Sequence, residues 1–506
     1  MKKIKPIVLL FLIATFLISC NKSDNKIKFT FLQLNDVYEI GALEGGEVGG
    51  MDRVETLHQQ LLKENPNTFM FMAGDFLNPS LLGNIKYKGE RIKGKHMVEV
   101  MNAMDFDLVA FGNHEFDLSE TLLQERINNS NFKWIATNLK HQVNEDILPF
   151  YKVNDSSKTV IPKTVIFDVK DDDGTEIQIG FFSATINSNP KPYVVYSDFY
   201  EDAKIAYNNL KTSTDLVIGL THLKISQDKM LSNMLPEVPL IMGGHEHTNM
   251  LIPVGKSVIT KADANAKTVY VHRFEYNKKT KELSLQSELV SIDSKIEKNE
   301  NIAAIIKKWQ MVLDKKIAEY SPNAHDVIFV AKVPLNGEDN AVRSEQTNLG
   351  DLITRAMAYS CDNKVDGALI NGGSMRLDDM LKGNITGVDI FRVLPFGGGV
   401  LKVDIKGSLL KKVLDYGRIK SGNGAYLQRF NFEYNRASKL WSCSGIPIND
   451  NKVYTVAFSD YLLKGYDIPF LNTDNKDVKN IYYPNEKDLS YDIRMAIISY
   501  LKSINS

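Results

Sequence analysis

The stretch Leu108-Val-Ala-Phe-Gly-Asn-His-Glu-Phe-Asp117 decides the fold of this chain. It starts with four apolar residues, as a buried strand does, and ends with an amide, an imidazole and two carboxylates. The glycine between the two parts lets the backbone turn sharply and approach a bound ion closely. In layered α/β sheets, ligands bind beyond the carboxyl ends of the strands. The stretch therefore predicts an α/β fold with a site at the ends of its strands.

Other short apolar runs end in the same way, so the pattern is repeated rather than isolated. The runs that we predict to be buried strands are Phe29–Leu34, Thr68–Ala73, Asp107–Phe111, Trp134–Ala136, Ile177–Ser183, Asp215–Leu220 and Pro239–Met242. Helical patterns lie between several of them, such as Val54–Leu62 and Met97–Met104. Polar, strand-rich sequence follows from Ser257 to Asp293. This alternation of strands and helices indicates an α/β layered domain.

The side chains at these strand ends form a set that is suited to metal binding. Carboxylates, an amide and imidazoles together favour Zn²⁺ or Mn²⁺, whereas an all-oxygen set favours Ca²⁺ or Mg²⁺. One carboxylate can also bridge two ions, and two-metal sites hold their ions about 3.5–4 Å apart to clamp a displacement at phosphorus. The candidate ligands are Asp36, Asp75, Asn113, His222, His245 and His247.

In this order, the motifs resemble those of the calcineurin-like metallophosphoesterases and, within them, the 5′-nucleotidase family. The motifs are Asp36, Gly-Asp75, Gly-Asn-His-Glu at 112–115, His222 and Gly-His-x-His at 244–247. Phe116-Asp117 is typical of the 5′-nucleotidase branch. The resemblance implies a four-layered α/β/β/α metallophosphoesterase domain, a connector helix and a C-terminal α+β substrate-binding domain. It also implies a hydrolase that acts on ester bonds.

Residue by residue, the resemblance implies two divalent metal ions. The first would be held by Asp36, Asp75 and His247, and the second by Asp75, Asn113, His222 and His245, with Asp75 as the bridge. His114 and Asp117 match the catalytic dyad of the family, beside Asn113. In that mechanism a metal-activated hydroxide attacks phosphorus while His114 stabilises the developing charge.

Tyr38 departs from the family pattern. The family usually has Asp-x-His in the first motif, with the histidine as a metal ligand, whereas this chain has Asp36-Val37-Tyr38. Tyr38 either replaces that histidine silently or in a supporting role, which we favour, or binds metal as a phenolate. A phenolate ligand prefers a hard ion such as Fe³⁺, and a neutral phenol with a pKa of about 10 is a poor ligand. We therefore expect Zn or Mn, with iron at one site as the alternative.

The C-terminal half resembles the substrate-binding blocks of the same family. Two arginines are suited to phosphate or carboxylate, two aromatic rings can sandwich a base at roughly 1–3 kcal/mol each, and an acidic group can bind ribose hydroxyls. The residues that match are Arg343, Asn371, Arg376, Phe396, Tyr461 and Asp467. Tyr461 stands where the family usually has Phe, and Gly398 where bacterial members often have Asn, so base preference is not predicted.

These motifs divide the chain into segments. We predict a metallophosphoesterase domain over 28–295, a connector helix over 296–323 and a substrate-binding domain over 324–506. The helix is indicated by apolar residues at helical spacing between Glu297 and Tyr320. A site split across two domains requires both of them, so we expect domain closure about the connector.

The first twenty residues have the pattern of a bacterial lipoprotein signal. Lysines at the start precede an apolar run that is too short for a comfortable transmembrane helix and that ends in Leu-Ile-Ser-Cys20. The resemblance to a lipobox implies a signal peptide over 1–19, lipidation at Cys20 and a tether over 20–27. An ordinary secretory signal is the alternative. We expect an extracytoplasmic protein held by lipid at the periplasmic face or the cell surface.

Composition limits the partners. With 61 basic and 62 acidic residues, the formal net charge of −1 gives no case for a polymeric nucleic acid partner. Three cysteines exclude a disulfide scaffold, and whether Cys361 and Cys443 pair stays open. No protein partner is implied.

The function predicted from these patterns is metal-dependent hydrolysis of nucleoside 5′-monophosphates to nucleoside and phosphate, with a small-molecule nucleotide as the substrate. Hydrolysis of a UDP-sugar pyrophosphate or of a 2′,3′-cyclic nucleotide is the alternative within enzymes. A nucleotide-binding surface lipoprotein without catalysis is the alternative from another class, and the His114–Asp117 pair argues against it.

Overall fold

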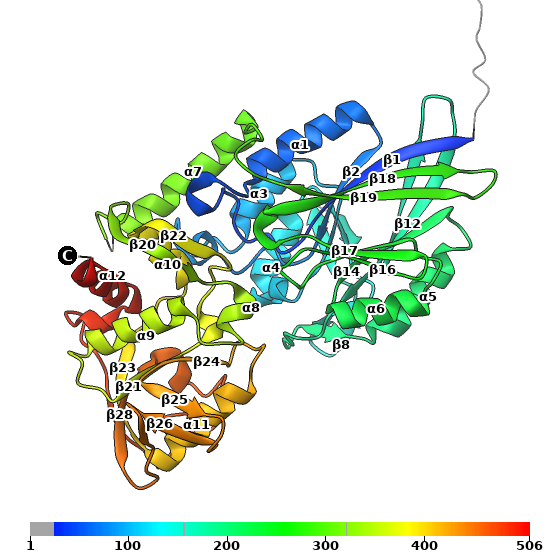
Figure 1. Cartoon of the computed structure of the whole chain (residues 1–506). Coiled ribbons are helices and arrows are strands. Elements are labelled where there is room, and N and C mark those ends of the chain that lie inside the picture. The colour runs from blue at the N-terminus through cyan, green and yellow to red at the C-terminus, as the bar shows by residue number, and fades with distance from the viewer. Residues whose placement is uncertain (1–24, 155–156, 320, 506) are drawn as a thin grey trace, which may run out of the picture.

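A computed structural model describes residues 25–154, 157–319 and 321–505. The predicted signal peptide and the predicted lipidation site Cys20 lie outside these residues, as does most of the predicted tether. The chain forms two lobes, here called the N-terminal lobe (residues 25–319) and the C-terminal lobe (residues 321–505) (Figure 1). No helix among the described residues is both long and apolar enough to cross a membrane.

The first sheet of the N-terminal lobe has six strands in the order β19-β18-β1-β2-β5-β6. The central strands β1, β2, β5 and β6 are parallel, whereas β18 runs antiparallel to β1 and closes that side with β19. Their bounds are β1 Lys26–Leu34, β2 Thr68–Ala73, β5 Leu108–Ala110, β6 Lys133–Ile135, β18 Thr268–Asn277 and β19 Leu283–Ser291.

The second sheet also has six strands, in the order β11-β12-β14-β15-β17-β16. Strands β12, β14, β15 and β17 are parallel to one another. Their carboxyl ends therefore lie along one edge, which is where the predicted ligands follow the strands. The bounds are β11 Thr164–Lys170, β12 Glu176–Thr185, β14 Leu216–His222, β15 Leu240–Gly243, β16 Met250–Val254 and β17 Ser257–Lys261.

The two sheets pack face to face over an aromatic core. Phe31 on β1 contacts Phe71 on β2 and Phe181 on β12, with ring centroids 4.8 and 5.7 Å apart. Helices cover the outer face of each sheet: α1 and α3 pack against the first, and α5 and α6 against the second. This is the four-layered α/β/β/α arrangement, and the fold prediction is confirmed. The helices are α1 Met51–Glu64, α3 Lys95–Ala103, α4 Glu120–Asn129, α5 Phe199–Leu210 and α6 Ile225–Met234.

The predicted connector is helix α7, Glu300–Ala318. It packs along α1 and α3 of the N-terminal lobe, and the buried Trp309 on its inner face donates a hydrogen bond from Nε1 to Glu99 at 2.9 Å. The far end of α7 leads into the C-terminal lobe (Figure 1). The connector is therefore anchored to the N-terminal lobe.

The C-terminal lobe is built on a five-stranded sheet in the order β24-β21-β28-β23-β29. Strands β20 and β22 pair separately, and helices α9, α10, α11 and α12 complete the lobe. The bounds are β20 Val327–Asn336, β21 Gly367–Asn371, β22 Met380–Thr386, β23 Val400–Lys406, β24 Leu427–Phe430, β28 Val453–Ser459, β29 Val478–Tyr482, α9 Asn348–Ser360, α10 Gly387–Val393, α11 Gly407–Ile419 and α12 Ile493–Ile504. Cys361 and Cys443 are both free thiols in this lobe.

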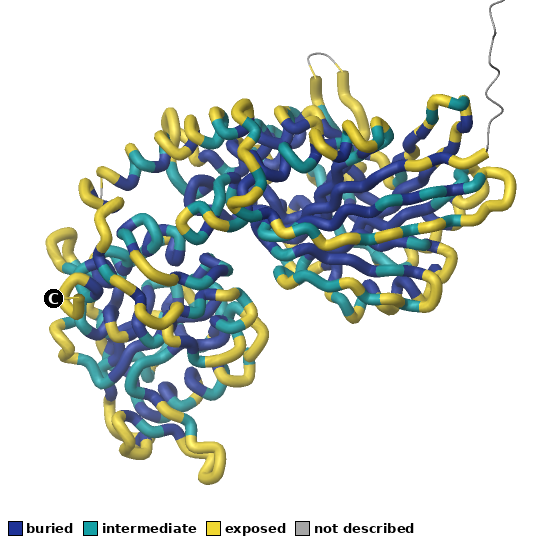
Figure 2. Tube along the Cα trace, turned by 45° about the horizontal axis from the view of Figure 1, so that its top comes forward, coloured by how far each residue is buried: buried dark blue, intermediate teal, exposed yellow. Residues whose placement is uncertain are grey.

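The remaining elements are short and lie mainly at the periphery. They are α2 Leu81–Asn84, α8 Asp339–Val342, β3 Lys86–Tyr87, β4 Glu90–Arg91, β7 Leu139–Val143, β8 Asp146–Leu148, β9 Tyr151–Asn154, β10 Ser157–Val160, β13 Val194–Tyr196, β25 Phe432–Asn435, β26 Leu440–Cys443 and β27 Ile446–Pro447. Figure 2 shows the inner strands of the two large sheets as mostly buried and the edge strands and many connecting loops as more exposed.

Candidate active site

The first two predicted ligands lie directly after neighbouring strands of the first sheet. Asp36 follows β1 and Asp75 follows β2, both in the left-handed backbone region, with φ of 53° and 57°. Non-glycine residues adopt this conformation when the surrounding structure imposes it, and it is frequent at functional sites. The backbone therefore turns sharply at each strand end, and both carboxylates are buried.

Glu115 fixes the turn after β2. Its buried carboxylate accepts hydrogen bonds from the backbone N–H groups of Asp75 at 2.9 Å, Phe76 at 2.8 Å and Gly112 at 2.6 Å. Burial, followed by the nearby Asp75 carboxylate, raises the pKa of Glu115 to about 7. The Asn-His-Glu motif thus contributes Glu115, which holds the turn of Asp75, as well as the candidate ligand Asn113.

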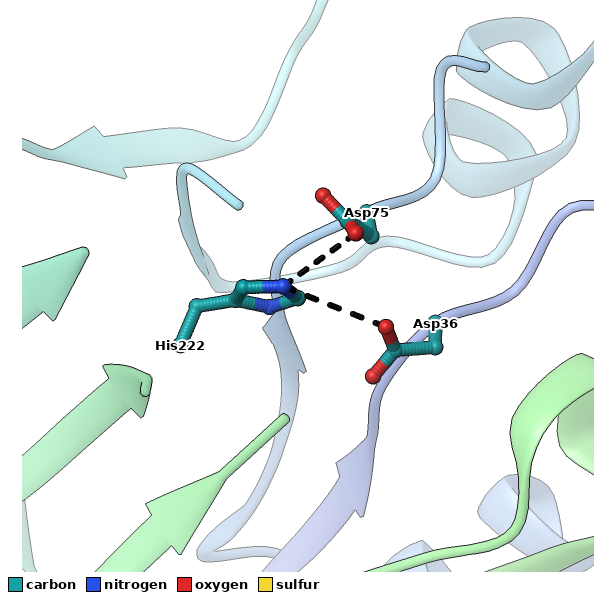
Figure 3. A group of neighbouring side chains, drawn as sticks. All are labelled: Asp36, Asp75 and His222. Carbon is teal, nitrogen blue, oxygen red and sulfur yellow. Dashed lines mark ion pairs between the residues drawn. The ribbon is translucent and has the colours of Figure 1, made fainter. Parts of the chain in front are cut away.

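His222 faces both carboxylates (Figure 3). Its Nε2 lies 3.2 Å from Oδ2 of Asp75 and 3.9 Å from Oδ1 of Asp36. Its Nδ1 lies 2.8 Å from the carbonyl oxygen of Ala73, which assigns the ring proton to Nδ1 and leaves Nε2 free for a ligand. Nε2 is buried and has no hydrogen-bond partner among the described residues.

These observations fit a divalent metal ion. The ligand atoms of Asp36, Asp75 and His222 all lie within 4.8 Å of one another. Burial opposes the ionisation of Asp36, yet His222 and His247 bring its pKa below the ordinary value, so the group is anionic in the folded chain. Buried carboxylates and an imidazole nitrogen that faces them are the donors that Zn²⁺ or Mn²⁺ takes.

The remaining candidate ligands surround this group. The backbone N–H of His245 donates to Oδ2 of Asp36 at 2.9 Å, and its Nδ1 lies 3.2 Å from Oδ1 of Asn113. Nε2 of His247 lies 3.5 Å from Oδ1 of Asp36. The structure therefore brings all six predicted ligands into one cluster.

Tyr38 lies inside the same cluster. Its hydroxyl oxygen is 3.4 Å from Oδ1 of Asp36, 3.3 Å from Oδ2 of Asp75 and 3.3 Å from Nε2 of His247. Burial, followed by the charges of Asp75 and Asp36, holds the pKa of Tyr38 well above its usual range. Without a cation the side chain is thus the neutral phenol.

The predicted catalytic dyad is formed and further supported. Nδ1 of His114 lies 2.7 Å from Oδ2 of Asp117. Two amides that the sequence patterns did not indicate donate to the same carboxylate: Asn78 at 2.8 Å and Asn189 at 2.9 Å. The sequence around Asp117 does not indicate these two partners, because both asparagines lie on other loops.

A buried lysine, also not predicted, supports the Gly-His-Glu-His turn. Nζ of Lys261 donates to the carbonyl oxygen of Gly244 at 2.7 Å, and it forms ion pairs with Asp228 at 2.8 Å and with Glu246. A fully buried lysine needs such partners to offset its desolvation. The only sequence signal was a Lys at the end of an apolar strand.

The predicted substrate residues gather in the C-terminal lobe. Asp467 accepts a hydrogen bond from Nδ2 of Asn371 at 2.8 Å and from the hydroxyl of Tyr461 at 3.3 Å. The guanidinium carbon of Arg376 lies 5.8 Å from the ring centroid of Phe396. The Phe396 side chain is 52% exposed, so one ring face is available to a ligand.

The backbone conformation of Gly398 and its close neighbour favour glycine at this position. Its φ is 106°, and a Cβ at this position would lie 2.6 Å from Oδ1 of Asp460. An asparagine, which bacterial members of the resembled family often carry, would clash here unless Asp460 moved. The loop after Phe396 therefore makes different contacts from those of an asparagine-bearing loop.

The two lobes contact each other at the site through His247. Nδ1 of His247 lies 2.7 Å from Oδ2 of Asp378 in the C-terminal lobe. The Arg376 guanidinium acts on the dyad: burial opposes ionisation of Asp117, but His114 and then Arg376 lower its pKa to about 2. Asp378 was not predicted, although it lies only two positions after Arg376.

Each of the two lobes matches a known family of domains. Residues 29–249 match the family model described as calcineurin-like phosphoesterase, and residues 327–472 match the model of the 5′-nucleotidase C-terminal domain. The chain belongs to the 5′-nucleotidase family. It is 27% identical over 478 residues to the 5′-nucleotidase of Mus musculus, with 83% of this chain and 78% of the relative covered. It is 25% identical over 469 residues to the snake venom 5′-nucleotidase of Crotalus adamanteus, with coverage of 83% and 75%.

Solved structures share the fold. The 5′-nucleotidase precursor of Thermus thermophilus superposes with a TM-score of 0.73 at 22% identity, covering 95% of this chain and 97% of the other. The sulfate thiohydrolase SoxB of the same organism gives 0.68 at 15% identity, covering 94% of each chain. The fold, the family and the assignment to hydrolases acting on ester bonds are thus confirmed, and the phosphoesterase family implies divalent metal ions.

Proposed function

We propose that this member of the 5′-nucleotidase family hydrolyses nucleoside 5′-monophosphates to nucleoside and inorganic phosphate, outside the cytoplasm. One observation carries the proposal: the candidate metal side and the candidate substrate side meet, because Asp378, two positions after Arg376, lies 2.7 Å from His247 of the other lobe. A phosphate held at the candidate metal ligands would therefore lie beside the segment of the C-terminal lobe that carries Arg376, a side chain suited to binding phosphate.

For the metal ions, we assign the first to Asp36, Asp75 and His247 and the second to Asp75, Asn113, His222 and His245. When bound, a pair of divalent ions supplies charge that polarises the phosphoryl group and makes water a nucleophile near neutral pH. The chain itself holds the turn of Asp75 in place through Glu115, and it directs Nε2 of His222 toward both carboxylates through Ala73. Zn²⁺ and Mn²⁺ fit this donor set best.

The dyad is assigned to charge stabilisation. Because Nδ1 of His114 is occupied by Asp117, its Nε2 faces the phosphoryl group and the leaving oxygen and donates to them when the ring is an imidazolium. Asn78 and Asn189 hold the Asp117 carboxylate, so the imidazole has one favoured orientation. Together with Asn113, this group would stabilise the transition state.

Nucleotide recognition is assigned to the C-terminal lobe. Phe396 and Tyr461 offer the ring faces for a base, and Asp467, held by Asn371, offers a carboxylate for ribose hydroxyls. Nε of Arg343 and Nε of Arg376 are buried and have no hydrogen-bond partner among the described residues, which leaves them available to an anionic substrate.

The proposed location is supported by the sequence alone. The lysine-rich start, the short apolar run and Cys20 predict a lipid anchor. Expression of the full chain in a bacterium, followed by fractionation, tests this. We expect wild-type protein in the membrane fraction and the Cys20→Ala variant out of it; an unchanged distribution would refute the anchor.

A panel of substrates tests the activity itself. Phosphate release is measured from AMP and UMP, and product formation from UDP-glucose and from a 2′,3′-cyclic nucleotide, with His114→Ala as the inactive control. We expect the monophosphates to give the highest kcat/KM. Faster turnover of UDP-glucose or of the cyclic nucleotide would assign the enzyme to that substrate class instead. No turnover of any of them would favour a nucleotide-binding protein without catalysis.

A further inference from the structure

Asp378 connects a candidate metal ligand to the opposite lobe. Its Oδ2 lies 2.7 Å from Nδ1 of His247, and its Oδ1 accepts a hydrogen bond from the backbone N–H of Asp339 at 2.9 Å. Lys267 of the N-terminal lobe donates to its carbonyl oxygen at 3.1 Å. Both carboxylate oxygens of Asp378 are thus committed, and its backbone is held in the left-handed region with φ of 49°.

The contact continues to a candidate substrate residue. The Asp339 carboxylate forms an ion pair with Arg343 at 2.7 Å. On the other side, Nε2 of His247 points at Oδ1 of Asp36, 3.5 Å away. Arg343, Asp339, Asp378, His247 and Asp36 therefore form one continuous chain of contacts from the nucleotide side to the metal side.

We propose that Asp378 is a positioning residue that couples nucleotide binding in the C-terminal lobe to metal binding in the N-terminal lobe. By accepting the Nδ1 proton of His247, it fixes the tautomer that presents Nε2 to the ion. The proposal rests on the proposed function, because it takes His247 as a metal ligand and Arg343 as a nucleotide contact.

The physical basis is that one hydrogen bond serves both sites. Partners that orient a ligating histidine typically change metal affinity by about 10–100-fold when they are removed. Here the orienting group lies on the other lobe, so it acts only when the lobes are docked as observed. A nucleoside that holds the C-terminal lobe in that position must then strengthen metal binding, and by linkage the metal must strengthen nucleoside binding equally.

Calorimetric titration of Mn²⁺ into the metal-free full chain, purified in detergent, tests the coupling. Titrations are run with and without saturating adenosine, and repeated with uridine because base preference is not assigned. For wild-type protein we expect Mn²⁺ to bind at least about 5-fold more tightly with nucleoside. For Asp378→Ala we expect Mn²⁺ affinity to fall about 10–100-fold and the enhancement by nucleoside to disappear.

Two variants serve as controls. Asp378→Asn should recover part of the affinity, because its amide oxygen can accept the same proton, and thermal unfolding reports whether each variant is folded. Lys382→Ala removes the ion pair with Glu44, another contact between the lobes that touches no candidate ligand, and should behave as wild type.

The outcomes separate the two proposals. If Asp378→Ala binds Mn²⁺ as tightly as wild type, or keeps the full enhancement by nucleoside, the coupling role of Asp378 is wrong. If the wild-type chain binds no Mn²⁺, or if His247→Ala binds it unchanged, the assignment of the metal ligands fails instead.

Discussion

The two lobes contribute to the candidate site in different ways. In the N-terminal lobe the ligands sit at strand ends and are buried; Asp36 and His222 are both 0% exposed. In the C-terminal lobe most of the candidate substrate residues lie on loops and short turns, with Asn371 at the end of β21, and the Phe396 ring is half exposed. Chemistry that requires fixed charges is placed on rigid strands, whereas recognition is placed on loops that present faces to solvent. Loss of the first should abolish turnover, and loss of the second should mainly weaken binding.

The largest effect is expected at the carboxylate shared by both metal positions. Asp75→Ala should lower kcat on every substrate by more than about 10³-fold. Loss of one hydrogen-bond donor to a transition state costs roughly 10²–10³-fold, and this change removes a ligand shared by two metal ions. Metal content measured on the same preparation should fall in parallel. Asp168→Ala, which removes an exposed carboxylate on β11 of the same lobe, is the matched control. Retained activity in Asp75→Ala would contradict the bridge.

A smaller effect is expected at the dyad. His114→Ala should lower kcat by about 10²–10⁴-fold with little change in KM, because the imidazole acts on the transition state rather than on binding. The loss should be equal for AMP and for p-nitrophenyl phosphate, measured in steady-state assays. A loss confined to AMP would instead place His114 in nucleotide recognition.

In the C-terminal lobe, Phe396→Ala should separate binding from chemistry. We expect KM for AMP to rise by about 5–100-fold, as loss of a stacking worth roughly 1–3 kcal/mol implies. Turnover of p-nitrophenyl phosphate, which has no base to stack, should be spared. Tyr483→Ala, which removes an aromatic ring exposed at 65% elsewhere on the lobe, is the control. An equal loss on both substrates would argue against stacking.

The smallest effect is expected at Tyr38. If its hydroxyl supports the carboxylates without binding metal, Tyr38→Phe removes one hydrogen bond of about 1 kcal/mol and changes metal affinity less than 10-fold. Elemental analysis should then find zinc or manganese in both proteins and no absorption band in the visible region. Stoichiometric iron with a visible band that Tyr38→Phe abolishes would show that the phenolate is a ligand.

Much of the metal side was predictable because strand ends repeat a local pattern. Every predicted strand of the N-terminal lobe is present, and the ends differ by a few residues. The run Asp107–Phe111 shortens to Leu108–Ala110, because Phe111 and Gly112 already belong to the turn that carries Asn113. An apolar run that ends in glycine and a candidate ligand predicts both the strand and the place of the ligand at the end of that strand.

The residues that hold the site together were not predictable from local sequence. Asn78 and Asn189 meet at Asp117 only after three loops pack, and Lys261 meets its partners only after α6 and the turn that follows β15 pack beside β17. Asp378 requires the docking of two lobes, which no spacing in the chain encodes. Tyr38 was noticed as a departure, but its place among Asp36, Asp75 and His247 needed the structure.

The most direct test of the central claim is phosphate release from AMP by the purified full chain, measured before EDTA treatment, after it, and after Mn²⁺ or Zn²⁺ is restored. A cluster of buried carboxylates and imidazoles that works through divalent ions predicts that EDTA abolishes release and that one of these ions restores it. Release that persists unchanged after complete removal of metal would contradict the account, as would its absence with every metal supplied.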